Sequence, residues 1–315
     1  MKTIELQNAF FKNLINKKLY WTLMRDNYSS VIPQLQSLIS NGDECQNIVI
    51  EKDGAYLTKK NGVKIYFDFS QTICRAEGDL FMGQDYEKDE MDYIGNYLKN
   101  HASRNVLDIG GNVGIFSLDL AVENKSLVYN IFEPIPNTYK KLLDNLKLNN
   151  KSEDNFKTYN IGLSNKAGSF DFYLPATDEA ASMQPIEDSF YRKGSNEMGE
   201  YTGKDKMEKV VCLVDTVDNI VSSKGIDNIG FIKIDVEGNE KFVLQGAKET
   251  LSKFKPLVYC ELLRIHSARF GYHPNEVIDY MAEFGYKCYV MKDKELIQID
   301  KITEETVETN FFFKC

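Results

Sequence analysis

The sequence predicts an α/β protein with a mostly parallel sheet that is covered by helices on both faces. From Asn105 onwards, short apolar segments alternate with segments of helical periodicity. The apolar segments are nearly continuous, which is typical of parallel strands buried on both faces. A glycine-rich turn at 110–114 joins the first of them to a helix, and such turns often hold a nucleotide-like cofactor.

The expected elements follow the same alternation along the chain. Strands are predicted at 105–109, 127–133, 156–162, 229–235, 256–262, 286–291 and 310–315. Helices are predicted at 88–100, 114–123, 137–149, 238–253 and 274–285. Because no helical pattern separates the last two strands, we expect that pair to be antiparallel. The segment "KAGSFDFYLP" predicts an extra strand outside this series.

Residues 1–80 are predicted to form an extension of an N-terminal helix and a β-hairpin or meander, and residues 81–315 the main domain. A helical apolar stripe marks residues 3–40, and the turn dipeptides Asp53-Gly54 and Asn61-Gly62 separate strand-like runs. Residues 176–209 of the main domain are rich in Ser, Glu, Lys, Gly and Met. A loop of that length predicts a lid or an acceptor-binding wall.

Composition narrows the classes of protein. The chain has 315 residues, a net charge of −9 and a pI of about 5.1, which does not favour nucleic-acid binding. It contains no run of the ~20 apolar residues that a membrane helix needs, and no signal-peptide core near residue 1. We therefore expect a cytoplasmic protein without a membrane span. Six cysteines without a C-x-x-C pair predict reduced, buried thiols: Cys45, Cys74, Cys212, Cys260, Cys288 and Cys315.

The glycine turn favours S-adenosylmethionine over a dinucleotide. Its spacing is D-x-G-x-x-x-G from Asp108 to Gly114, with Asn112 where the dinucleotide pattern G-x-G-x-x-G has its second glycine. An acid such as Asp108 at the strand tip repels a pyrophosphate but can accept from the ammonium group of S-adenosylmethionine. Glu133 ends the second strand, where a carboxylate can accept from both ribose hydroxyls. That last contact fits NAD and S-adenosylmethionine alike.

Five segments in order resemble the FkbM family of S-adenosylmethionine-dependent methyltransferases over roughly residues 84–291. They are "VLDIGGNVGIFSL", "IFEPIPNTYKKLLDNLKLN", "NIGLSNKAGSFDFY", "IGFIKIDVEGNEKFVLQGAKETL" and "YCELLRIHSARFGYHPNEVIDYMAEFGYKCYVM", preceded by "GQDYEKDE". "IKIDVEGNE" is the most specific, and the family usually has Ala where Gly111 stands. The resemblance implies the class I methyltransferase fold, a Rossmann-like sheet of seven strands in the order 3-2-1-4-5-7-6 with strand 7 antiparallel. It also implies methylation of hydroxyl oxygens, often on sugars, glycans or macrolide-type products.

Cofactor-binding residues are expected at the carboxyl ends of the first three strands and just before the fold. The predicted set is Glu87, Asp108, Gly110, Gly111, Asn112, Gly114, Glu133, Pro134, Asn160, Ile161 and Gly162.

The predicted catalytic residues are Asp235, Glu261 and His266. Asp235 ends the fourth strand and can act as the general base, and Glu261 ends the adjacent strand. Together they could hold Mg²⁺ or Mn²⁺, which would lower the pKa of the acceptor hydroxyl. His266 follows the fifth strand as an alternative base, or as a hydrogen-bonded loop histidine. Glu237 is either a site carboxylate or a residue interacting with a helix start.

These patterns together with the resemblance predict an O-methyltransferase, and the resemblance implies a small-molecule hydroxyl acceptor such as a carbohydrate or nucleotide sugar. A homodimer through the N-terminal region is a further expectation. Two alternatives stay open: a non-catalytic S-adenosylmethionine-binding or assembly protein on the same fold, and an NAD-dependent oxidoreductase. The intact Asp108 and Glu133 argue against the first, and the altered glycine spacing argues against the second.

Overall fold

The structure is a computed structural model that describes residues 12, 18–19, 22–23, 45–51, 54–67, 87–174, 181–185 and 208–315. The predicted helix at 3–40 therefore lies almost entirely outside the described residues, as do most of the loop at 176–209 and Cys74.

An eight-stranded mixed sheet forms the centre of the main domain, in the order β13-β12-β14-β11-β10-β4-β5-β6. Its strands are β4 (Asn105–Ile109), β5 (Val128–Phe132), β6 (Phe156–Tyr159), β10 (Ile229–Ile234), β11 (Leu257–Glu261), β12 (Lys287–Lys292), β13 (Glu295–Ile299) and β14 (Asn310–Lys314). The five from β6 to β11 are parallel, and β12, β13 and β14 pair antiparallel. The seven predicted strands thus occur in the predicted order, and β13 adds an eighth.

The additional strand β13 arises from a two-residue turn. Asp293 and Lys294 join β12 to β13 with φ angles of 51° and 68°, and Lys292 pairs with Glu295 across the turn. Hairpin turns with two positive φ angles usually carry Asn-Gly or Asp-Gly. The sequence Asp-Lys lacks that signal, which explains why the strand was not predicted.

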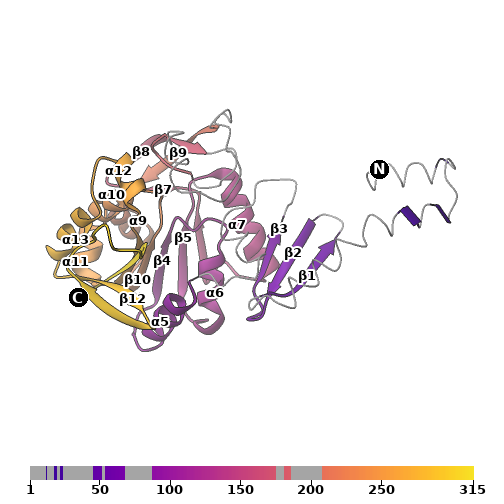
Figure 1. Cartoon of the computed structure of the whole chain (residues 1–315), viewed down its shortest axis with the longest axis horizontal. Coiled ribbons are helices and arrows are strands. Elements are labelled where there is room, and N and C mark those ends of the chain that lie inside the picture. The colour runs from indigo at the N-terminus through magenta and orange to yellow at the C-terminus, as the bar shows by residue number, and fades with distance from the viewer. Residues whose placement is uncertain are drawn as a thin grey trace.

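Helices cover both faces of the sheet, as the sequence predicted (Figure 1). The helices α5 (Lys88–Lys99), α6 (Ile115–Glu123) and α7 (Pro136–Leu148) supply Ile94, Leu118 and Leu142 to one buried cluster. The other cluster is built on α9 (Val217–Lys224), α10 (Glu240–Gln245), α11 (Lys248–Phe254) and α13 (Asn275–Ala282). The central strand β10, IGFIKI, lies between them with every residue buried. No helix within the described ranges is both long and apolar enough to cross a membrane.

The predicted meander is confirmed. Strands β1 (Cys45–Glu51), β2 (Gly54–Lys59) and β3 (Lys64–Phe67) form an antiparallel sheet beside α7 (Figure 1). Asn145 of α7 accepts a hydrogen bond from the main-chain N of Tyr66 at 2.8 Å, and Lys59 forms an ion pair with Asp119 of α6. Leu57 belongs to the same buried cluster as α6 and α7. The division of the chain near residue 80 stays a prediction.

A second small sheet corrects the prediction of one long strand at 156–162. The strand β6 ends at Tyr159, and β7 (Gly162–Leu163) pairs with β9 (Glu208–Asp215), which pairs in turn with β8 (Gly168–Leu174). The chain leaves the main sheet at Asn160, whose side chain donates to the main-chain oxygens of Glu133 and Pro134. The strand β8 is the predicted extra strand. Residues 176–207 of the predicted loop lie between β8 and β9 in the sequence, and its last two residues, 208–209, belong to β9.

Two helical predictions also change. The predicted helix at 238–253 is two helices, α10 and α11, which meet at Gly246, where a Cβ atom would lie 2.1 Å from the Ser164 main-chain oxygen. The helices α9 and α12 (Arg264–Arg269) were not predicted. They are only 8 and 6 residues long, so they offer little periodicity to detect.

The described cysteines are free thiols, and the predicted burial holds for four of them. Cys45, Cys212, Cys260 and Cys288 are buried, whereas Cys315 is exposed.

Candidate active site

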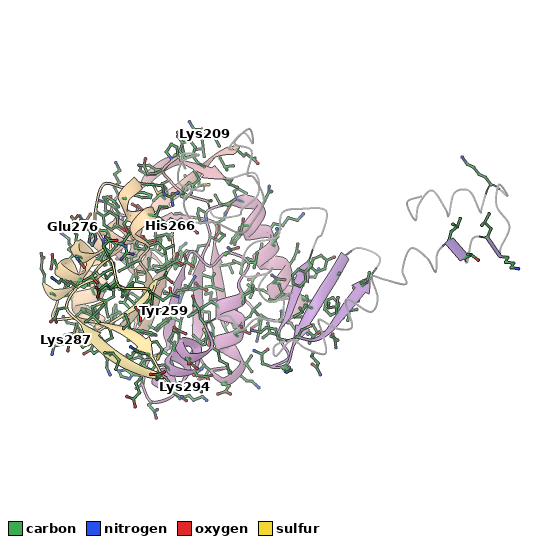
Figure 2. All side chains as sticks on the ribbon, viewed as in Figure 1. Lys209, Tyr259, His266, Glu276, Lys287 and Lys294 are labelled. Carbon is green, nitrogen blue, oxygen red and sulfur yellow. The ribbon has the colours of Figure 1, made fainter. Side chains whose placement is uncertain are left out.

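The candidate site lies where the parallel strands end. Figure 2 shows His266 toward the end of the molecule that carries the β8–β9 hairpin and Lys209, with Lys287 and Lys294 at the opposite end. A pocket with about 660 Å³ of empty space, part of it open to solvent, lies at this edge. Its wall combines the ends of β4, β5 and β10 with the small sheet: Ile109, Gly110, Asn112, Phe132, Glu133, Pro134, Ile135, Ile161, Gly162, Leu163, Phe172, Ala181, Met183, Asp235, Val236, Glu237 and Asn239.

The turn after β4 requires glycine for steric reasons. Gly110 has a φ angle of 79°, and a Cβ atom there would lie 1.8 Å from the main-chain oxygen of Asp235. A Cβ atom at Gly111 would lie 2.2 Å from Ile131, and Gly114 has a φ angle of 88° at the start of α6. The glycines therefore let the turn approach the end of β10 closely. This contact brings the residues after β4 and after β10 to one pocket.

Asp108 lies beneath the turn and is fully buried. Its Oδ2 accepts a hydrogen bond from the Ser117 hydroxyl at 2.6 Å, and its Oδ1 lies 3.7 Å from the Lys233 ammonium. Lys233 is also buried and reaches Asp235 Oδ2 and the Gly110 carbonyl oxygen, each at 3.2 Å. Burial alone would lower the pKa of Lys233, but the carboxylates of Asp235, Asp108 and Glu87 outweigh it, so the pKa is raised. A protonated Lys233 thus links the glycine turn to Asp235.

Glu133 lies at the pocket wall with its carboxylate held in place by main-chain donors. Its Oε2 accepts from the N–H of Asn112 at 3.1 Å, and its Oε1 accepts from the N–H of Ile135 at 2.8 Å. Because the two donors belong to the turn after β4 and the start of α7, they fix the orientation of the carboxylate. Asn160 holds the main-chain oxygens of Glu133 and Pro134.

The predicted cofactor residues fall into three groups. Those that line the pocket are Gly110, Asn112, Glu133, Pro134, Ile161 and Gly162. Asp108, Gly111, Gly114 and Asn160 support the turn or the wall from behind. Glu87 belongs to neither group: its Oε1 accepts from Asn310 at 2.8 Å, Asn310 pairs with Glu261 at the end of β11, and its carboxylate interacts electrostatically with Lys233 and Asp235. Its assignment to cofactor binding stays a prediction.

Sequence reasoning predicted the loop at 176–209 as a wall, but it missed the individual residues that this loop and the small sheet contribute to the pocket. Phe172 comes from β8, and Ala181 and Met183 come from the described segment 181–185. They carry no motif, and only the pairing of β7, β8 and β9 brings them beside the ends of β4 and β5. For Phe172, the alternating pattern of "SFDFYL" was a signal that predicted the strand but not its position beside the pocket.

The turn after β10 gathers several carboxylates. Asp235 and Glu237 line the pocket, and Glu237 has a left-handed φ angle of 56°. The Glu237 main-chain oxygen accepts from the Ser182 hydroxyl at 3.1 Å. The Glu240 carboxylate accepts from the N–H of Gly238 at 2.8 Å inside this turn. Burial raises the pKa of Glu240 to about 7.

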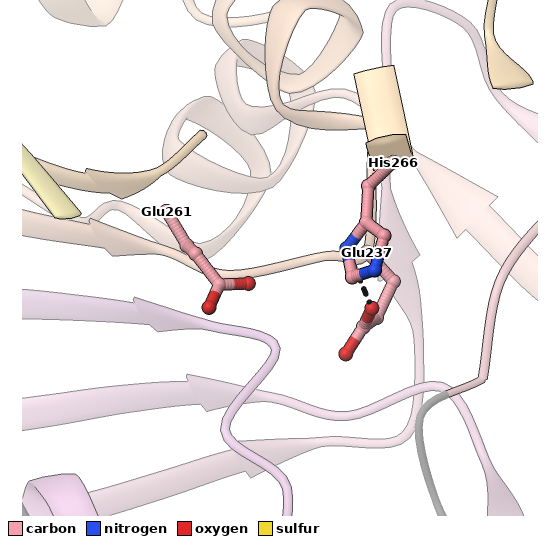
Figure 3. Close-up of side chains that lie close together, drawn as sticks. All are labelled: Glu237, Glu261 and His266. Atoms are coloured by element: carbon pink, nitrogen blue, oxygen red, sulfur yellow. Dashed lines mark ion pairs between the residues drawn. The ribbon is translucent and has the colours of Figure 1, made fainter. Parts of the chain in front are cut away.

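Beside the pocket, Glu237, Glu261 and His266 converge from three segments, the turn after β10, the end of β11 and α12 (Figure 3). His266 Nδ1 lies 3.0 Å from Glu237 Oε2, and one potential ligand atom from each residue lies within 4.8 Å of the others. Burial, followed by the charges of Asp235 and Glu237, raises the pKa of Glu261 well above its ordinary value. The predicted metal pair of Asp235 and Glu261 thus differs from the group that the geometry brings together, in which Glu237 and His266 accompany Glu261. All three predicted catalytic residues lie at this edge of the sheet.

Comparison with known proteins places these residues in a family. The family model described as "Methyltransferase FkbM domain" matches residues 108–288, which is more than half of the chain. Three similar proteins are methyltransferase sdnD of Sordaria araneosa, 2-O-methyltransferase NoeI of Sinorhizobium fredii and 31-O-demethyl-FK506 methyltransferase FkbM of Streptomyces tacrolimicus. The methyltransferase sdnD is 28% identical, and the match covers 46% of this chain and 60% of the relative. NoeI is 27% identical, with 50% of this chain and 62% of the relative covered. The FkbM methyltransferase of Streptomyces tacrolimicus is 28% identical, with 46% of this chain and 59% of the relative covered. The chain thus spans about three fifths of the length of these relatives. The matched region contains the glycine turn, Glu133 and the residues after β10 and β11, and the chain belongs to the family with a methyltransferase FkbM domain.

Proposed function

We propose that the protein is an S-adenosylmethionine-dependent O-methyltransferase that acts on a hydroxyl of a sugar, nucleotide sugar, glycan or related natural product. The observation that carries the proposal is one pocket that joins the glycine turn and the oriented Glu133 carboxylate to Asp235 and Glu237. It lies beyond the carboxyl ends of parallel strands, where ligands bind in open α/β sheets. Family membership supports methyl transfer as the reaction.

The residues present fit S-adenosylmethionine. Glu133 would accept hydrogen bonds from the ribose, and the buried Asn112 Oδ1, which has no hydrogen-bond partner among the described residues, offers a further acceptor at the same wall. Ile135, Ile161 and Phe172 supply apolar surface for the adenine. When bound, the cofactor supplies an electrophilic methyl group, whose C–S bond breaks as the new C–O bond forms.

Asp235 is proposed as the group that takes the hydroxyl proton during attack. A free alkoxide is negligible near pH 7, so the transfer needs a base within hydrogen-bond reach of the hydroxyl. The Lys233 ammonium at 3.2 Å orients the Asp235 carboxylate and links it to the turn that bounds the cofactor pocket. His266 is the alternative base, and the 3.0 Å contact with Glu237 orients its imidazole.

The names of two relatives support an oxygen acceptor. One is named a 2-O-methyltransferase and the other a 31-O-demethyl-FK506 methyltransferase, and both names specify O-methylation. Their acceptors belong to those proteins, and the acceptor of this chain is proposed only as a small hydroxyl compound. The loop at 176–209 is proposed as its lid or wall, because Ala181 and Met183 already line the pocket. A homodimer through the N-terminal region and a cytoplasmic location are proposed as well.

A panel experiment tests the function. The full chain is incubated with S-adenosylmethionine that carries a labelled methyl group and with a panel of nucleotide sugars, free glycans and hydroxylated macrolides. We expect label in one class of acceptor, in a methyl ether that resists mild base. Label on a carboxyl or amine, with no hydroxyl compound labelled, would contradict O-methyl transfer. Calorimetry with NAD in place of S-adenosylmethionine tests the oxidoreductase alternative, which requires NAD to bind.

A further inference from the structure

We infer that Glu237, Glu261 and His266 form a binding site for one divalent cation of the Mg²⁺ or Mn²⁺ class, next to the cofactor pocket. The residues come from three segments, the turn after β10, the end of β11 and α12, and one potential ligand atom from each lies within 4.8 Å of the others (Figure 3). Two carboxylate oxygens and one imidazole nitrogen are a mixed donor set that such ions accept.

The distances suit a common central ion. Bonds of about 2.1 Å at right angles place neighbouring ligand atoms about 3 Å apart, and opposite ones about 4.2 Å apart. The separation between His266 Nδ1 and Glu237 Oε2 is 3.0 Å, and the ligand atoms of all three residues lie within 4.8 Å of one another. The side chains of Glu237 and His266 are each 23% exposed, which leaves an open side for a water or an acceptor.

The charges at this place point to a cation independently of the distances. Among the described residues, none forms a hydrogen bond or ion pair with the largely buried Glu261 carboxylate. The buried ammonium of Lys233 forms ion pairs with Asp235 and Asp108 and donates a hydrogen bond to the Gly110 carbonyl oxygen. Arg269 reaches the main-chain oxygen of Glu237 at 3.3 Å. The ionised carboxylates of Glu237 and Glu261 would repel each other in these partly buried surroundings. This repulsion costs free energy unless a positive charge lies between them.

The backbone of the site is fixed before any ion binds. Glu237 adopts a left-handed φ angle of 56°, which non-glycine residues rarely do outside constrained places. The hydroxyl of Ser182 and the guanidinium of Arg269 both donate to its main-chain oxygen. This turn directs the Glu237 side chain toward His266, and without it the two residues would not meet.

The position of Glu237 gives the ion a role. Glu237 lines the cofactor pocket and also belongs to the trio, so the cation site adjoins the pocket. A cation there can bind the acceptor oxygen and lower the pKa of its hydroxyl. The proton then passes to Asp235 as the oxygen takes the methyl group and the C–S electron pair stays on sulfur. This role rests on the proposed function, whereas binding of the ion does not.

The test measures Mn²⁺ binding to the full chain by electron paramagnetic resonance, without turnover. We expect one bound Mn²⁺ per chain, with spin-echo modulation from a directly bound ¹⁴N nucleus. Each of Glu237→Gln, Glu261→Gln and His266→Gln should weaken binding at least ~10-fold, and His266→Gln should also remove the nitrogen modulation. Glu123→Gln, a matched change at the exposed end of α6, should leave the affinity unchanged. Melting curves without Mn²⁺ establish that each variant is folded.

Three results would overturn the cation site. They are no stoichiometric Mn²⁺ binding to the wild-type chain, binding that survives in folded variants of the trio, and binding lost in Asp235→Asn but kept in Glu237→Gln and His266→Gln. The last would assign the ion to Asp235 and Glu261 instead. Titration with S-adenosylmethionine in EDTA separates the two proposals. A chain that binds the cofactor but not Mn²⁺ refutes the cation site alone, and one that binds Mn²⁺ but not the cofactor refutes the proposed function alone.

Discussion

Glu133 is the residue on which the proposed cofactor site depends most. Its carboxylate is held by the N–H groups of Asn112 and Ile135 at the pocket wall. We predict that Glu133→Ala weakens S-adenosylmethionine binding by about 2–3 kcal/mol, because two charge-assisted hydrogen bonds to the ribose are lost. Isothermal titration calorimetry measures the change, with Glu123→Ala on the exposed end of α6 as the control. Equal dissociation constants in Glu133→Ala and wild type would refute the ribose contact.

A substitution of Asp235 should lower kcat without a comparable loss of affinity for S-adenosylmethionine. It lines the pocket beside Glu237 and forms an ion pair with Lys233 at 3.2 Å. We predict that Asp235→Asn lowers kcat at least ~10²-fold while the affinity for S-adenosylmethionine stays within a few-fold, because the amide keeps the shape but cannot take a proton. Single-turnover methyl transfer provides the measurement. A near-normal kcat would exclude Asp235 as the base and leave His266 as the next residue to test.

Among single residues of the candidate site, those at strand ends were predictable from the sequence, whereas contacts that depend on loops were not. Glu133 and Asp235 follow apolar strands directly and Asp108 lies near the end of one, so their common edge could be inferred. The contact of Glu237 with His266 could not, because it depends on a left-handed backbone at Glu237 and on α12, which has six residues. Burial of Asp108 under the turn was equally hidden, because nothing in the sequence shows that Ser117 and Lys233 surround it.

The glycine turn is the element whose geometry tolerates least change. A Cβ atom at Gly110 would lie 1.8 Å from the Asp235 oxygen, and its φ angle is 79°. We predict that Gly110→Ala lowers the free energy of unfolding by about 2–4 kcal/mol. Gly225→Ala is the matched control, because its φ angle is 63° but nothing lies within 4 Å of the added atom. It should cost only ~1 kcal/mol. Equal losses in urea unfolding would contradict a steric origin.

The turn after β10 should make stability depend on pH. Burial raises the pKa of Glu240 to about 7, so the folded chain keeps a proton that the unfolded chain releases from about pH 4.5 upwards. The contribution of protonated Glu240 to the free energy of unfolding is therefore fully present below about pH 4.5 and is lost as the pH rises to about 7. We predict that wild type loses on the order of 2 kcal/mol more than Glu240→Gln between pH 5 and 7.5.

Denaturant unfolding at several pH values measures that slope. Glu276→Gln is the control, because its ion pair with Lys241 at 2.7 Å holds the pKa of the exposed Glu276 below its ordinary value. It therefore does not titrate in this range, and its slope should match that of wild type. A Glu240→Gln slope that also matches wild type would show that Glu240 is ionised in the folded chain throughout.

Among the elements, length and turn chemistry decided what could be predicted. The long periodic helices α5 and α7 and the buried strands β4 and β10 were predicted within a few residues. The strand β9 was missed because Val211 and Leu213 are exposed, at 65% and 62%, so its pattern does not show a buried face. The prediction of one helix at 238–253 was wrong, because the helix is interrupted at Gly246. The main chain of Ser164 approaches so closely there that only glycine fits.

At the scale of the whole molecule, the order of the main sheet was predictable and its additions were not. The order was predicted from the resemblance alone, whereas strand–helix alternation predicted a mostly parallel sheet, and the antiparallel pairing of β12 and β14 agrees with the predicted order. The small sheet of β7, β8 and β9 forms one wall of the pocket through pairing over long sequence distances, such as Gly162 with Val214. Local patterns carry no information on such pairs, so this wall of the pocket was harder to predict than the glycine turn and Glu133.

A crystal structure of the full chain with S-adenosylhomocysteine tests the central claim most directly, because it locates the cofactor. We predict that the ligand occupies the pocket between the glycine turn and the small sheet, with both ribose hydroxyls within hydrogen-bond distance of the Glu133 carboxylate and the sulfur facing Asp235. A ligand that binds elsewhere on the chain, or that lies in the pocket with its ribose away from Glu133, would contradict the site proposed for methyl transfer.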